Sequence, residues 1–116
     1  MLHKRYRLVK DKDFAKVAHY GQKAYSSGFN LKWIKNNQPC SRWGIIVSLK
    51  VDKKAVVRNK IKRRLRAILR ENIGSLVPGL DVIIITKDQI KKLDYSQLKK
   101  IFLEILDKNN LIIRQK

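Results

Sequence analysis

A helical pattern in residues 53–72 limits the possible folds of this chain more than any other part of the sequence. Apolar side chains recur there every three or four positions. At 100° per residue they fall within one arc of about 120°, which is typical of a helix that packs one side against a core. We therefore predict a long helix over residues 53–72. Its core-facing side chains would be Val57, Ile61, Leu65, Ile68 and Leu69.

The other side of the same helix is basic. Every charged residue from Lys53 to Arg70 is Lys or Arg, and the first acid is Glu71. Like charges at helical spacing repel by roughly a few tenths of a kcal/mol per pair, so the pattern favours a helix that binds anions. The predicted outward arc consists of Asn59, Lys62, Arg63, Arg66 and Arg70, with Arg58 at its border, where the guanidinium can reach over the rim of a sheet.

The charge of the whole chain indicates which polyanion is bound. Its 116 residues include 28 Lys and Arg against 9 Asp and Glu, a net charge of +19. Nucleic acid is the usual partner of such a chain. Asn59 is the only base-reading residue type on the basic arc, and phosphate contacts carry no sequence information, so a reader of shape and backbone fits best. Structured RNA is therefore favoured over DNA.

Two alternatives use the same helix differently. A solvated face that keeps the protein soluble needs neither this density of cations nor the absence of interspersed Glu. A helix on an anionic membrane surface would bury an apolar side bearing Trp or Phe, whereas this stripe is aliphatic. The longest apolar runs are strand-sized and too short to span a bilayer.

The remaining patterns predict one α+β domain over residues 1–116. A short helix over residues 11–18 ends before Gly21, and extended segments follow at 22–25, 29–34 and 43–49. After the basic helix come a central strand at 81–86 and a last helix from a capping box at Asp94. The order is α-β-β-β-α-β-α, and an α/β sandwich of sheet and helices is the simplest architecture. The stripe of the last helix is Leu98, Ile101, Phe102, Ile105 and Leu106.

We expect no catalytic and no metal-binding residue in this chain. A protein nuclease needs carboxylates for two metals or a His pair, but the acids are scattered and neither His3 nor His19 has a companion nearby. Cys40 is the single cysteine and is interpreted as a free thiol in a reducing compartment. The first residues lack the apolar stretch of a secretory signal, so a cytoplasmic protein is expected.

The segment Arg58-Asn59-Lys60-Ile61-Lys62-Arg63 resembles the signature helix of the bacterial ribonuclease P protein subunit. The resemblance extends to Arg7-Leu8, Asp13-Phe14, Val17 and Gly21 upstream, to Trp43-Gly44-Ile45-Ile46-Val47-Ser48, and to the strand that begins at Asp81. It implies a fold like the ribosomal-protein S5 domain 2-like fold, with a left-handed crossover at the signature helix. General chirality rules alone would predict a right-handed one.

The resemblance also implies different roles for the RNA and for the protein. RNA performs the cleavage, with Mg²⁺ bound through the RNA subunit, and one protein per RNA assists by holding that RNA and the 5′ leader of precursor tRNA. The implied contacts with the RNA subunit are Arg58, Asn59, Lys60, Lys62, Arg63, Arg66 and Arg70. The implied leader contacts, in a cleft between the first helix and the sheet, are Phe14, Lys16, Val17, Phe29, Trp33, Ser48 and Lys50.

Two positions depart from the family pattern. Ala18 stands where the family commonly has an aromatic residue, which removes one stacking platform for the leader. Asp52 stands where a Gly often precedes the signature helix, so the turn there can differ. On the residues alone, a non-catalytic ribosome-associated RNA-binding protein remains the alternative function.

Overall fold

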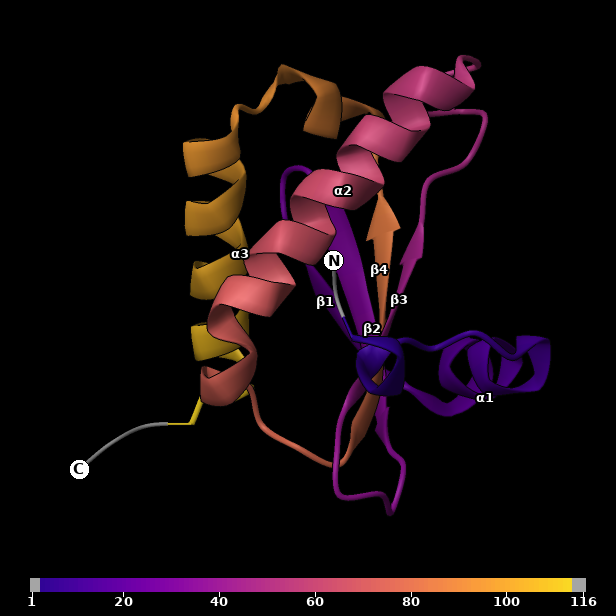
Figure 1. Cartoon of the computed structure of the whole chain (residues 1–116), viewed down its shortest axis with the longest axis vertical. Coiled ribbons are helices and arrows are strands. Elements are labelled where there is room, and N and C mark those ends of the chain that lie inside the picture. Colours follow the sequence, from indigo (N-terminus) through magenta and orange to yellow (C-terminus); the bar gives the residue numbers. More distant parts are fainter. Residues whose placement is uncertain (1–2, 114–116) are drawn as a thin grey trace.

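The computed structural model describes residues 3–113, and it contains the predicted order of helices and strands (Figure 1). Three short 3-10 helices, η1 (Lys4–Tyr6), η2 (Ile73–Ser75) and η3 (Asp88–Lys92), join the longer elements. The mixed α+β fold predicted from the sequence is confirmed. The helices and strands are α1 (Asp11–Tyr20), β1 (Gln22–Tyr25), β2 (Phe29–Lys35), β3 (Arg42–Ile46), α2 (Ala55–Asn72), β4 (Leu80–Thr86) and α3 (Tyr95–Lys108).

The four strands form one sheet in the order β1-β2-β4-β3. β2 pairs antiparallel with β1 and β4, whereas β3 runs parallel to β4 and is joined to it through α2. In Figure 1 both parallel strands point upward, α2 lies in front of the sheet, and β4 lies to the left of β3. This arrangement makes the crossover left-handed, as the family resemblance implied and against the general preference.

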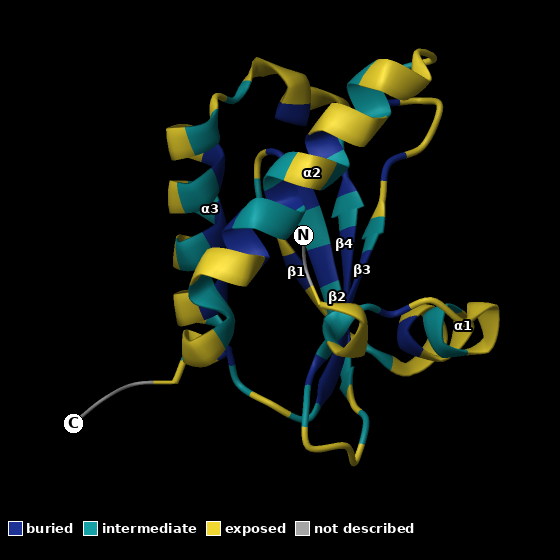
Figure 2. Cartoon of the chain, in the orientation of Figure 1, coloured by how far each residue is buried: buried dark blue, intermediate teal, exposed yellow. Residues whose placement is uncertain are grey.

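Alternation along the strands produces two different faces. One face carries Leu31, Val82 and Ile84, and it packs against the buried sides of α2 and α3 in the larger core (Figure 2). The opposite face carries Ile83, which packs with Val17 of α1 in a smaller cluster. β4 is central, as predicted, and every residue in it except Ile85 is buried. α1 and Leu8 of the N-terminal segment therefore cover the face opposite α2 and α3.

Several boundaries differ from the sequence-based prediction. β3 ends at Ile46 rather than at residue 49, because the chain turns where the Val51 N–H donates to the Ser48 carbonyl at 3.0 Å. α2 begins at Ala55 rather than at residue 53, because Lys54 keeps an extended backbone and donates its N–H to Asp52 Oδ1 at 2.8 Å. Asp52 thus orders the turn where the family often has Gly.

The predicted capping box of α3 is present. The Asp94 carboxylate accepts the Gln97 N–H at 2.8 Å, and the Gln97 side chain accepts the Asp94 N–H at 2.9 Å. The predicted apolar stripe of α3 faces the core: Leu98, Phe102, Ile105 and Leu106 are buried, and Ile101 is half-buried. α3 therefore begins at a fixed point and covers the sheet beside α2.

Candidate functional site

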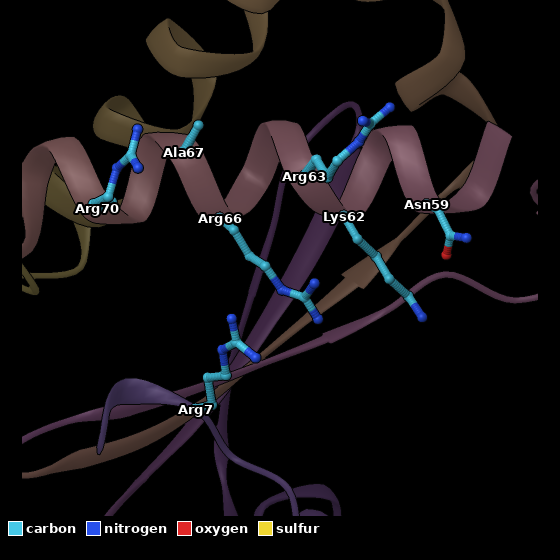
Figure 3. A pocket seen from close by; sticks show the side chains of 7 residues that line it. All are labelled: Arg7, Asn59, Lys62, Arg63, Arg66, Ala67 and Arg70. Atoms are coloured by element: carbon cyan, nitrogen blue, oxygen red, sulfur yellow. The ribbon is translucent and has the colours of Figure 1, made fainter. Parts of the chain in front are cut away.

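A groove of about 500 Å³ lies along the basic side of α2 (Figure 3). Four of the five predicted core-facing residues of this helix are buried, and Val57 is half-buried, so the helix presents the expected side to the core. Among the residues that the structure describes, none that lines the groove is acidic. The lining residues are Arg7, Asn59, Lys62, Arg63, Arg66, Ala67 and Arg70.

Arg7 forms the wall of the groove opposite α2. It pairs with Trp43 in a parallel bridge, and the next residue, Leu8, donates its N–H to the Trp43 carbonyl at 2.9 Å. Because Leu8 is buried, the N-terminal segment is fixed along the edge of β3. In Figure 3 the guanidinium groups of Arg7 and Arg66 point toward each other from the two sides of the groove.

The two facing guanidinium groups carry like charges, and this affects the pKa of Arg66. Burial, and then the like charge of Arg7, lower the pKa of Arg66 below its ordinary value. Both causes disfavour the charged form of a cation. An anion placed between the two guanidinium groups would favour the charged form of Arg66, so the site favours binding of a negatively charged group such as a phosphate.

Arg58 has a different environment from the rest of the basic face. Its Nη1 donates to the carbonyl oxygens of Lys53 at 2.8 Å and Asp52 at 3.1 Å. The guanidinium therefore reaches back over the turn before α2, consistent with its border position on the helix. Arg58 fixes the start of α2 in addition to any contact that it makes with a ligand.

A family model described as Ribonuclease P matches residues 2–110 of this chain. The chain belongs to the ribonuclease P protein family. Members of this family are the protein component of the ribonuclease P holoenzyme, which processes the 5′ end of tRNA, and catalysis lies with the RNA. The groove on α2 is thus found in a protein that works with an RNA partner.

Relatives and solved structures agree with this membership. The ribonuclease P protein component of a Cyanothece species is 35% identical, over 97% of this chain and 98% of the relative. That of Geobacillus kaustophilus is 33% identical, over 91% of this chain and 88% of the relative. These matches do not favour the ribosome-associated alternative.

The fold matches solved proteins of the same family. A Staphylococcus aureus RNase P protein mutant with defective mRNA degradation activity superposes with a TM-score of 0.86 at 28% identity, covering 93% of this chain and 91% of the other. The RNase P protein from Thermotoga maritima superposes with a TM-score of 0.80 at 30% identity, covering 88% and 96%.

Most of the RNA-subunit contacts implied by the family resemblance lie together. Asn59, Lys62, Arg63, Arg66 and Arg70 line the groove, and Lys60 is exposed on the same helix but outside the lining. Arg7 was missed as a site residue. No spacing in the sequence relates it to α2, because only the bridge to β3 brings the two together.

The implied leader contacts separate into two groups. Lys16, Ser48 and Lys50 are exposed. Phe14 is half-buried, and its ring lies so close to Gly44 that a side chain at position 44 would collide with it. Val17 is buried beneath α1, while Phe29 and Trp33 are 0% and 7% exposed in the core under α2 and α3. This placement argues against direct contact of Val17, Phe29 and Trp33 with RNA. The open side of β2 instead presents Asn30 and Lys32.

An ionic cluster fixes α1 against the sheet beside these residues. Arg42 donates from Nε and Nη2 to the two oxygens of Asp81 at 2.9 and 2.7 Å, and Asp13 of α1 lies 3.4 Å from its Nη1. Asn36 also donates to Asp81 Oδ1 at 2.9 Å. The hydrogen bond with Asp81 raises the pKa of Arg42, against the effect of burial.

Within residues 3–113 no group of three or more His, Cys, Asp or Glu side chains is arranged to hold a metal ion. No helix in that range is long and apolar enough to cross a membrane. Cys40 is a free, half-buried thiol.

Proposed function

We propose that the α2 groove binds the RNA subunit of ribonuclease P through its phosphates. The observation that carries this proposal is a groove lined by four arginines and one lysine, with no acid among the described lining residues. Structured RNA supplies closely spaced phosphates to such a surface. Arg58 and Lys60 extend the same surface toward the start of α2, and Arg7 is added to the contacts expected from the sequence.

We also propose that the opposite face of the sheet binds the 5′ leader of precursor tRNA. Lys16 of α1 is exposed, Phe14 of α1 is half-buried against Gly44 of β3, and Ser48 and Lys50 are exposed in the turn that follows β3. Single-stranded RNA is commonly held by cations along its backbone and by apolar or aromatic surfaces beneath its bases. This assignment keeps the leader on the α1 side of the sheet and the RNA subunit on the α2 side.

In this proposal the protein supplies charge and position, not the cleaving group. Mg²⁺ is assigned to the RNA subunit, because catalysis in this family lies with the RNA. The cations of α2 neutralise phosphates that would otherwise require metal ions, so the protein should matter most when Mg²⁺ is scarce. One protein would serve one RNA, in the cytoplasm.

Reconstitution tests this function. The protein is added to a bacterial ribonuclease P RNA at low Mg²⁺, and the rate of leader removal from precursor tRNA is measured. We expect clear stimulation over the RNA alone, and a loss of most of it in the double variant Lys62→Ala/Arg66→Ala. Lys100→Ala, at an exposed lysine of α3, is the matched control. Cleavage at the RNA-only rate with the unaltered protein would contradict the proposal.

A further inference from the structure

A second pocket, of about 230 Å³, lies at the start of β3. Tyr6 lines this pocket, and the next residue, Arg7, lines the α2 groove, so one short segment borders both. Trp43 lines the pocket as well, and its side chain belongs to the larger core on the α2 side of the sheet. The other apolar lining residues include Pro39, Ile73, Leu76 and Pro78.

Hydrogen bonds hold the walls of this pocket in place. Ser41 donates from Oγ to the Val77 carbonyl at 2.7 Å and accepts the Leu80 N–H at 2.9 Å. The Val77 N–H in turn donates to the Leu111 carbonyl at 3.0 Å. The segment between α2 and β4 is therefore fixed both to the start of β3 and to the residues that follow α3. A pocket with such walls is formed before a ligand arrives.

The indole of Trp43 has an unused hydrogen-bond donor. Trp43 is 4% exposed, and its Nε1 is buried without a hydrogen-bond partner among residues 3–113. An indole N–H can only donate, and an unpaired buried donor is unfavourable. A ligand that places an acceptor against this N–H removes that cost. The pocket therefore suits a flat, largely apolar group that carries a hydrogen-bond acceptor.

Size and charge indicate which flat group this is. Sites for drug-sized molecules have volumes of about 300–1,000 Å³, so the smaller pocket suits a single ring system. The Arg5 guanidinium lies 5.6 Å from the centre of the Tyr6 ring, and Arg7 follows in the groove, so cations border the Tyr6 side of the pocket. A nucleobase is a flat ring system with acceptors on its edge, and phosphates lie on both sides of it along the chain. Proteins recognise structured RNA largely through unstacked bases in loops and bulges.

We propose that the pocket at Trp43 receives one unpaired base of the RNA subunit. The base accepts a hydrogen bond from Trp43 Nε1, and the phosphates beside it contact Arg5 and Arg7. The inference rests on the proposed binding of the RNA subunit along α2 and adds to it a contact with a base. Phosphate contacts position the RNA without reading its sequence, whereas an inserted base selects one particular loop or bulge.

Gly74 allows the pocket to be filled. It belongs to the lining, and a Cβ at this position would meet no other part of the chain within 4 Å. Gly74→Leu should therefore fold and weaken binding of ribonuclease P RNA by about fivefold or more, the contribution of one stacked base. Ser75→Leu is the matched control, because it adds the same side chain at an exposed neighbour outside the described lining. Chemical probing of the RNA should find one base that Ser75→Leu protects and Gly74→Leu does not.

Trp43→Phe tests the hydrogen bond itself. This variant keeps an aromatic ring and lacks the N–H, so it should bind the RNA about threefold or more weakly than the unaltered protein. Thermal melting of each variant verifies that it folds.

Cys40 gives a second measurement that needs no substitution, because it is the only cysteine of the chain and lines the same pocket. A saturating amount of RNA should abolish most of the alkylation of its thiol by iodoacetamide, which is a neutral reagent. A thiol that is already unreactive without RNA would mean that another part of the chain occupies the pocket.

That result would overturn the inference. So would equal alkylation of Cys40 with and without RNA, equal RNA affinities of Gly74→Leu and Ser75→Leu, or full affinity in Trp43→Phe. The thiol measurement decides if a variant does not fold. The proposed function survives each of these results as long as the unaltered protein stimulates cleavage by the RNA and the loss of Lys62 and Arg66 removes that stimulation.

Discussion

Single residues decide how α1 is held over the sheet. Asp81 is 5% exposed, and its charge is tolerated there because Arg42 and Asn36 both donate to it. Arg42 also reaches Asp13, so one guanidinium joins β3, β4 and α1. The position of α1, and with it the shape of the proposed leader surface, therefore depends on one buried carboxylate.

Asp81→Ala should lower the free energy of unfolding by about 2 kcal/mol, because it removes the buried carboxylate that accepts hydrogen bonds from Arg42 and Asn36. Urea denaturation measures the change. Asp88→Ala is the matched control, since Asp88 pairs with Lys91 at the surface and should contribute less than about 0.5 kcal/mol. Equal effects of the two substitutions would show that burial of the Asp81 pair does not matter.

Arg58 and Arg66 should respond differently to truncation, although both are proposed to contact phosphates. Each Ala substitution should reduce the slope of log affinity against log salt by about one, if one phosphate contact is lost. Arg58→Ala should also destabilise the free protein by about 1 kcal/mol, because it removes the bonds to the Asp52 and Lys53 carbonyls. An unchanged salt slope would place the side chain outside the RNA interface.

At the scale of elements, periodicity in the sequence predicted which helices and strands form. It did not always predict which face of a strand is available to a ligand. The order of helices and strands and the capping box at Asp94 follow from local patterns. The aromatics of β2 were expected near RNA, yet Phe29 and Trp33 lie on the core side. The strand alternates between Phe29, Leu31 and Trp33 on one face and Asn30 and Lys32 on the other. The apolar set faces the larger core because two helices cover that face.

The contact between α2 and α3 should depend on pH. Hydrogen bonds from the Tyr95 hydroxyl and then from Lys99 lower the pKa of Glu71. A depressed carboxylate pKa adds stability above its unfolded pKa, and this stability is lost as the pH falls through the folded pKa. Melting temperatures measured between about pH 5 and pH 3 should therefore fall less steeply for Glu71→Gln than for the unaltered protein. Parallel curves would contradict a role for this carboxylate.

At the scale of the whole molecule, the net charge of +19 opposes folding in the absence of anions. Sulfate or RNA that binds only the folded chain should raise the melting temperature. At a ligand concentration of about 100 times Kd, one site adds about 2.7 kcal/mol. Thermal melts in sodium sulfate and in sodium chloride of matched ionic strength separate site binding from screening. Identical melting temperatures in the two salts would count against specific anion sites.

The residues alone did not predict how the helices and strands are arranged in space. The strand order and the left-handed crossover need contacts between distant segments, and general rules favour the opposite hand. Arg7 joins the α2 groove through a bridge to Trp43 that no local pattern encodes. The family resemblance supplied the handedness, whereas the role of Arg7 required the structure.

The parallel pairing of β3 with β4 also fixes a sequence of events in time. β1 and β2 can pair as a hairpin while the chain is still emerging from the ribosome. β3 can pair with β4 only later, because β4 is synthesised after all of α2. Such non-local pairing closes slowly. The strongly cationic helix therefore emerges before the sheet that supports it is complete, and a nascent chain can meet nucleic acid before it has finished folding.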